Sequence, residues 1–208
     1  MTDNSAKLLE YIQNPSANGW CQPDKAMHLY NAVRERKAMR AIEVGVFAGK
    51  SLMALGLAMQ TLGRGEVIGI DPWTREASVI NNEGENAKWW ASVNYESIYE
   101  EAQHWVRHFQ LGDLVTLFRE TSQNAHYALY GDESETAIDV LHIDGNHSQW
   151  DSCRDVILWT PHVVSGGLIY LDDEDWETTT AAQELLSLRC EKIDEIKTTN
   201  VCGVYRKK

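Results

Sequence analysis

The stretch Ala41-Ile-Glu-Val-Gly45-Val-Phe-Ala-Gly49-Lys-Ser51 decides the fold. Its first half is a short apolar run that predicts a buried strand, and the residues that follow, 52–62, predict a strongly apolar helix. Gly45 and Gly49 allow a tight turn between the two elements and a close approach of a ligand to the backbone. The start of the helix leaves N–H groups free to bind that ligand. The stretch therefore predicts a strand–turn–helix unit with a binding site at the turn.

The rest of the chain repeats this alternation of strand and helix. Further apolar strands are expected at 66–71, 114–118, 137–144 and 167–172, with helices between them and a closing pair of strands at 192–196 and 201–206. Strands that are apolar almost throughout indicate a parallel sheet covered on both faces, which is an α/β fold. In such a sheet ligands bind at the carboxyl ends of the strands.

The domain organisation is expected to be simple, because the 208 residues contain no repeat and no Pro/Gly/Ser linker. We expect an N-terminal helical extension at 1–39, with one helix at 6–12 and a second beginning at Pro23, which suits a first helical turn. Residues 40–208 are expected to form one domain. The extension is placed to pack over the binding site or on a second copy of the chain, which would give a homodimer.

Composition limits the partners. The chain has 19 Lys and Arg against 31 Asp and Glu, a net charge of −12. Such a surface repels phosphate backbones and anionic lipid, so neither a nucleic acid nor a membrane surface is an expected partner. No apolar run reaches the length of a membrane span, and the first residues lack a signal-peptide pattern. The four cysteines form no CxxC pair. They indicate free thiols in a reducing compartment, and we expect a cytoplasmic protein.

Two acids accompany the glycine turn, and three interpretations compete for them. Glu43 stands just before Gly45, and Asp71 ends the second strand, where an acid can accept hydrogen bonds from ribose hydroxyls. An ordinary α/β turn with a satisfied acid is one interpretation. A nicotinamide dinucleotide site is disfavoured because Phe47 stands where that motif needs glycine. Glu43 suits an ammonium or sulfonium group better than a pyrophosphate, which favours an S-adenosylmethionine site.

At this point the sequence resembles a family. The pattern Glu-x-Gly-x-x-x-Gly-x-Ser at 43–51, followed by a strand that ends in Asp71, resembles the Rossmann-type S-adenosylmethionine-dependent methyltransferases. Phe47 matches the branch that includes catechol O-methyltransferase. The resemblance covers residues 20–208 and implies a doubly wound, seven-stranded, mostly parallel sheet with an antiparallel last strand. It implies cofactor contacts from Glu43, Gly45, Phe47, Gly49, Ser51, Asp71, Trp73, Thr121, Ser122 and Asp144.

A group of aspartates follows two later strands. Asp144 ends one, and Asp172 and Asp173 end the next. If these strands are neighbours, the three carboxylates converge, and such oxygen ligands suit Mg²⁺ or another divalent cation. The alternative is that the acidic run simply starts a helix. The resemblance to catechol and macrocin-type sugar O-methyltransferases implies that all three are metal ligands.

His147 lies three residues after Asp144, at the position of the catalytic base in those enzymes. Histidine suits a general base near neutral pH, although a lone histidine can also be structural. We therefore expect a Mg²⁺-dependent O-methyltransferase for a small hydroxylated molecule such as a sugar, polyol or catechol-like phenol, with Asp144 and His147 catalytic. The alternatives are a non-catalytic nucleotide-binding or scaffold module and an enzyme resembling the proteins of cephalosporin hydroxylation.

Overall fold

In the computed structural model, which describes residues 3–81, 84–131 and 137–208, the strands form a seven-stranded sheet of order β3-β2-β1-β4-β5-β7-β6. β7 pairs antiparallel with both β5 and β6, and the other pairs are parallel. This confirms the predicted sheet and its antiparallel last strand. The strands are β1 (Arg40–Val44), β2 (Glu66–Ile70), β3 (Val115–Phe118), β4 (Ile138–Ile143), β5 (Val163–Leu171), β6 (Cys190–Lys197) and β7 (Val201–Lys207).

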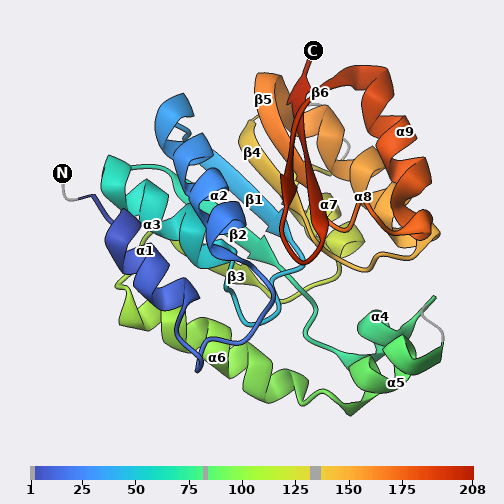
Figure 1. Cartoon of the computed structure of the whole chain (residues 1–208), viewed down its shortest axis with the longest axis horizontal. Helices are drawn as coiled ribbons and strands as arrows, with labels where there is room; N and C mark the ends of the chain where they lie inside the picture. The colour runs from blue at the N-terminus through green and yellow to red at the C-terminus, as the bar shows by residue number, and fades with distance from the viewer. Residues whose placement is uncertain (1–2, 82–83, 132–136) are drawn as a thin grey trace.

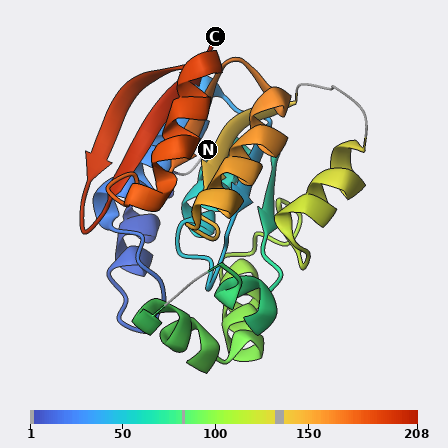
Figure 2. The same cartoon turned by 90° about the vertical axis from the view of Figure 1, so that its right-hand side faces the viewer.

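Helices cover both faces of the sheet (Figures 1 and 2). One face carries α1 (Ser5–Ile12), α2 (Pro23–Arg36), α3 (Leu52–Leu62) and α6 (Tyr95–His108). The other carries α7 (Ser122–Tyr130), α8 (Gln149–Trp159) and α9 (Thr180–Arg189). Short 3₁₀ helices stand at Thr160–His162 and Glu177–Thr179. Successive residues of each strand point to opposite faces, so each face has its own apolar core.

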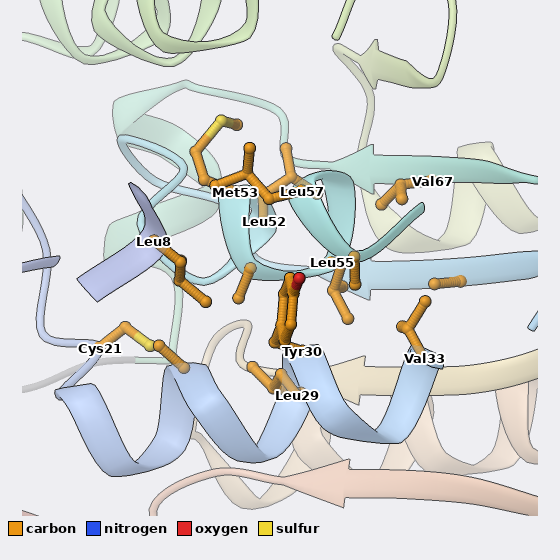
Figure 3. Packing of buried hydrophobic residues seen from close by; sticks show 14 of the residues in the cluster. Leu8, Cys21, Leu29, Tyr30, Val33, Leu52, Met53, Leu55, Leu57 and Val67 are labelled. Carbon is orange, nitrogen blue, oxygen red and sulfur yellow. The ribbon is translucent and has the colours of Figure 1, made fainter. Parts of the chain in front are cut away.

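The N-terminal extension packs into one of these cores. Leu29 and Tyr30 of α2 are fully buried against α3, whose residues Leu52 and Leu55 are also fully buried (Figure 3). The Tyr30 hydroxyl lies 2.8 Å from Oγ1 of Thr61, at the end of α3. Proline at the first position of α2 and a left-handed residue after its last turn fix where this helix begins and ends. Residues on α2 are therefore held in place relative to the sheet.

Between β2 and β3, where helices are expected, the described residues form α4 (Arg75–Val79), α5 (Gly84–Ser92) and α6. α4 and α5 lie beyond the carboxyl ends of the central strands (Figures 1 and 2). They form one wall over the edge at which β1, β2, β4 and β5 end. No helix of the described residues is long and apolar enough to cross a bilayer.

Candidate active site

Strand register places a row of polar side chains on the face that α2 covers. Glu43 of β1 is paired with His142 of β4, and His142 is paired with Tyr170 of β5. Asp144 and Asp172 come two residues after His142 and Tyr170, so the alternation of the strands turns them toward the same face. Burying ionisable groups in one row is costly unless they compensate one another, and hydrogen bonds and ion pairs supply part of that compensation.

Lys25 of α2 supplies a cation to this row. Its side chain is 2% exposed, and its ammonium donates a hydrogen bond to Oδ2 of Asp172 and lies 3.5 Å from Oδ2 of Asp144. Burial alone would lower the pKa of Lys25, but the two carboxylates raise it well above its usual value. The ammonium is therefore a permanent charge inside the protein.

Glu43 lies beneath the turn rather than in it. It is fully buried, accepts a hydrogen bond from the Ser51 hydroxyl, and lies 2.9 Å from Nδ1 of His142. Burial favours neutral His142, but the contact with Glu43 outweighs this and raises the pKa of His142. Glu43 therefore supports the turn and the row behind it, and it does not line the cleft described below.

His147 lies between two of the aspartates that line the cleft described below. Its Nε2 atom lies 2.7 Å from Oδ2 of Asp173 and 3.5 Å from Oδ1 of Asp144. Burial favours the neutral imidazole, but the hydrogen bonds to both carboxylates prevail and raise the pKa of His147 to about 10. Burial would also raise the pKa of Asp144, yet Lys25 and His147 hold it well below its usual range. Asn200 fixes the other oxygen of Asp173 with a hydrogen bond of 2.6 Å.

The glycine turn and Asp71 form the second half of the site. The backbone N–H groups of Val46 and Phe47 donate to Oδ2 of Asp71 at 3.1 and 3.0 Å, and that of Trp73 donates to Oδ1 at 2.7 Å. Gly45 has φ +89°, and a Cβ there would lie 2.0 Å from the carbonyl oxygen of Asp144. Only glycine allows β1 and β4 to approach this closely at the turn.

A single cleft of about 880 Å³ connects the two halves. Most of the predicted cofactor residues line it, namely Gly45, Phe47, Ser51, Asp71, Trp73, Thr121, Ser122 and Asp144. His147, Asp172 and Asp173 line it as well, whereas Glu43 and Gly49 do not. The cofactor assignments stay predictions, but the structure brings most of these residues to one surface.

Aromatic side chains wall one side of this cleft. The Trp20 ring lies 5.1 Å from that of Phe47 and 5.4 Å from that of Trp89, and Trp90 lies 4.8 Å from Trp89. Trp176 stands apart from this group, 5.4 Å from the His147 imidazole. Trp20 precedes α2 in the chain and Trp89 belongs to α5, so segments far apart in sequence supply the wall.

The three predicted metal ligands are not brought together as one set. Both aspartates follow the last residue of β5, and Asp173 has a left-handed backbone with φ +54°; Asp172 contacts Lys25 while Asp173 contacts His147. The described groups with metal-ligating atoms within 4.8 Å of one another are Asp144, His147 and Asp173, and separately His142, Asp172 and Cys202. Each group has a member in contact with Lys25, so a divalent cation bound there would face an ammonium already in place. The arrangement does not fit Mg²⁺ held by the three aspartates.

Sequence reasoning missed Lys25, His142 and Asn200. The sequence does indicate that Lys25 is buried, because it lies four residues before Leu29 and eight before Val33, on the apolar face of α2. A lysine on such a face is buried only when it finds a partner. His142 interrupts an apolar strand in the same way. Asn200 lies in a turn between β6 and β7, where no local pattern distinguishes it.

A family model described as "Methyltransferase domain" matches residues 42–174, more than half of the chain. The chain belongs to this methyltransferase family. The matched range runs from β1 through Asp173 and so contains the glycine turn and the His147 cluster. A search of curated proteins gave no match.

Solved structures share the methyltransferase fold at low sequence identity. The O-methyltransferase TomG from Streptomyces achromogenes, involved in tomaymycin synthesis and solved with SAM, is 16% identical; the alignment covers 100% of this chain and 91% of TomG, with a TM-score of 0.64. An O-methyltransferase from Bacillus cereus in complex with SAH is 13% identical, with coverage of 100% and 92% and a TM-score of 0.64. A tRNA (m1A58) methyltransferase, TrmI from Aquifex aeolicus, is 15% identical, with coverage of 97% and 76% and a TM-score of 0.62.

These neighbours carry the class I fold of S-adenosylmethionine-dependent methyltransferases, which this chain shares. They differ in what their names say they act on, so the fold leaves the methyl acceptor open. The class of methyl acceptor depends on the group formed by Asp144, His147 and Asp173 and on the aromatic wall.

Proposed function

We propose that this methyltransferase transfers the methyl group of S-adenosylmethionine to a hydroxyl of a small molecule. The observation that carries the proposal is the single cleft that joins the glycine turn and Asp71 to His147. One end offers a turn and a carboxylate suited to an adenosyl group, and the other offers an imidazole between two carboxylates. The names of two structural neighbours, TomG and the Bacillus cereus enzyme, support O-methyl transfer.

The residues at the turn fit a nucleoside. The glycine at 45 keeps the backbone open to a ligand, and Asp71 is held by three backbone N–H groups at the end of β2. Thr121 and Ser122, at the start of α7, also line this part of the cleft. We expect the ribose at Asp71, the adenine toward Thr121, and the sulfonium toward Asp144.

The chain's own contribution to the reaction is placement and proton removal. Bound S-adenosylmethionine would supply a methyl group on sulfur, and transfer to oxygen breaks the S–C bond and leaves its electron pair on sulfur. His147 and its two aspartates would hold the acceptor hydroxyl and take its proton as the new O–C bond forms. Holding the two reactants in line provides most of the acceleration in such a transfer.

The charge and the aromatic wall favour a small acceptor. Trp20, Phe47 and Trp89 suit the flat or apolar face of a phenol or a sugar ring. The net charge of −12 opposes a nucleic-acid acceptor, although the neighbour TrmI is named as a tRNA methyltransferase. Metal dependence stays a prediction from the sequence and is not part of this proposal, because Lys25 contacts two of the three carboxylates that a metal would need.

The proposal is tested first by calorimetric titration of the purified protein with S-adenosylhomocysteine, with NAD⁺ as the control nucleotide. Binding of the first alone supports it, and a folded protein that binds neither contradicts it. A panel of sugars, polyols and phenols with S-adenosylmethionine then tests the acceptor, with methylated product read by mass spectrometry. A short tRNA transcript in the same panel tests the nucleic-acid alternative.

A further inference from the structure

Lys25 reaches the carboxylates of β4 and β5 from an element outside the sheet. Its ammonium donates to Oδ2 of Asp172 and lies 3.5 Å from Oδ2 of Asp144. Asp172 is almost fully buried, so its charge needs a partner inside the protein. We propose that the ammonium of Lys25 takes the place of a divalent cation between Asp144 and Asp172, and that this methyltransferase works without a metal.

The position of Lys25 is built into the fold. Its neighbours Ala26 and Leu29 are fully buried, so α2 cannot retreat without opening the core. A cation such as Mg²⁺ binds carboxylate oxygens at about 2.0–2.1 Å, and the ammonium already lies against these same oxygens. A divalent cation that joined it would bring two further positive charges into a buried site that already holds the ammonium.

The remaining carboxylate of the cluster is compensated as well. Asp173 accepts hydrogen bonds from His147 at 2.7 Å and from Asn200 at 2.6 Å, one at each oxygen. Each aspartate of the predicted metal site thus contacts a protein cation, and Asp144 shares Lys25 with Asp172 and His147 with Asp173. Protein groups therefore hold most of these carboxylate oxygens without an ion, and Oδ1 of Asp172 is left buried without a hydrogen-bond partner.

The exchange of a metal for an ammonium changes which acceptors the site prefers. A divalent cation offers open positions that two neighbouring hydroxyls fill together. An ammonium offers N–H donors, and at least one of these is used on Asp172. Selection for a vicinal diol therefore disappears, and we expect the site to accept a single hydroxyl held at His147. This consequence rests on the proposed function, whereas the metal-binding claim does not.

The test is a titration of the wild-type protein with Mn²⁺, followed by the electron paramagnetic resonance signal of free Mn²⁺, with and without S-adenosylhomocysteine. Asp144→Asn measures the background of the acidic surface. We expect wild type and Asp144→Asn to give the same curve up to millimolar Mn²⁺. Lys25→Ala is expected to bind one additional Mn²⁺ at least tenfold more tightly than this background, and Lys50→Ala, which alters a lysine that lines the cleft, to match wild type.

One outcome overturns the proposal directly: a wild-type protein that binds one Mn²⁺ and loses it in Asp144→Asn or His147→Ala. A folded Lys25→Ala protein without the additional ion also overturns it, because the ammonium would then not stand in a cation's place. If Lys25→Ala does not fold, the comparison of the wild-type Mn²⁺ curve with that of Asp144→Asn tests the proposal by itself. Once a methyl acceptor has been identified, the rate of its methylation should be unchanged after dialysis of the protein against EDTA. A protein that fails to bind S-adenosylhomocysteine contradicts the proposed function and leaves the Mn²⁺ result intact.

Discussion

His147 and Asp173, which both line the cleft, form an ion pair with 2.7 Å between Nε2 and Oδ2. Oδ1 of Asp144 lies 3.5 Å from the same nitrogen. The imidazole is consequently held in its protonated form, with a pKa raised to about 10. This base is well placed, but at neutral pH it is already protonated and cannot accept the proton of the acceptor hydroxyl. The pH dependence of the reaction follows from this.

The transfer rate is expected to rise with pH up to about 10. Only the neutral imidazole accepts a proton, and its fraction grows about tenfold for each pH unit below the pKa. Asp173→Asn removes one of the charges that raise the pKa of His147. The pH–rate profile of this variant should therefore be shifted to lower pH. The check is the single-turnover rate across pH 6 to about 10 in both proteins. Identical profiles would remove His147 as the base.

Lys25 is expected to matter for stability as well. Lys25→Met leaves Asp144 and Asp172 without their cation, and removal of one partner of a buried ion pair costs about 3–5 kcal/mol. The double variant Lys25→Met/Asp172→Leu removes a charge of each sign and should recover much of this loss. Urea unfolding of the three proteins measures both effects. A single variant within about 1 kcal/mol of wild type would show that the ammonium does not hold these carboxylates.

The outline of the fold follows from local rules, and so does part of the site. The glycine turn after β1, the acid after β2 and the aspartates after β4 and β5 are all readable because parallel strands end at one edge. Strand alternation does not set the directions of Asp172 and Asp173, because both follow the end of β5 and Asp173 has a left-handed backbone with φ +54°. The sequence cannot say which of the two faces α2, because that depends on how the extension docks.

The contribution of Lys25 is tertiary in origin. Its position on the apolar face of α2 indicates burial, but the partner lies 147 residues away in sequence. No spacing rule connects the two. The same holds for Trp20, whose contact with Trp89 brings the loop before α2 to the helix α5. Contacts made by elements that pack over the carboxyl ends of the strands are therefore not predicted by the sequence.

Asp71 is expected to hold the cofactor end of the cleft. Asp71→Asn replaces a charged acceptor of three backbone N–H groups by an amide, whose NH₂ group must face at least one of them. Hydrogen bonds to a charged group contribute about 1.5–3 kcal/mol each, so the affinity for S-adenosylhomocysteine should fall roughly tenfold to a hundredfold. Glu66→Gln, at the other end of β2, is the matched control. Calorimetry that finds equal affinities for Asp71→Asn and wild type would place the nucleoside elsewhere.

Trp20 is expected to act on the acceptor and not on the cofactor or the fold. Its side chain is 52% exposed, so its removal leaves no hole in the core, yet it packs at 5.1 Å on Phe47 in the wall of the cleft. Trp20→Ala should raise the KM for the acceptor severalfold, while the affinity for S-adenosylhomocysteine and the melting temperature stay near wild type. Tyr127→Ala, which removes an exposed aromatic ring outside the cleft, should change none of the three. A Trp20→Ala protein with an unchanged KM would move the acceptor away from the aromatic wall and toward Trp176, beside His147.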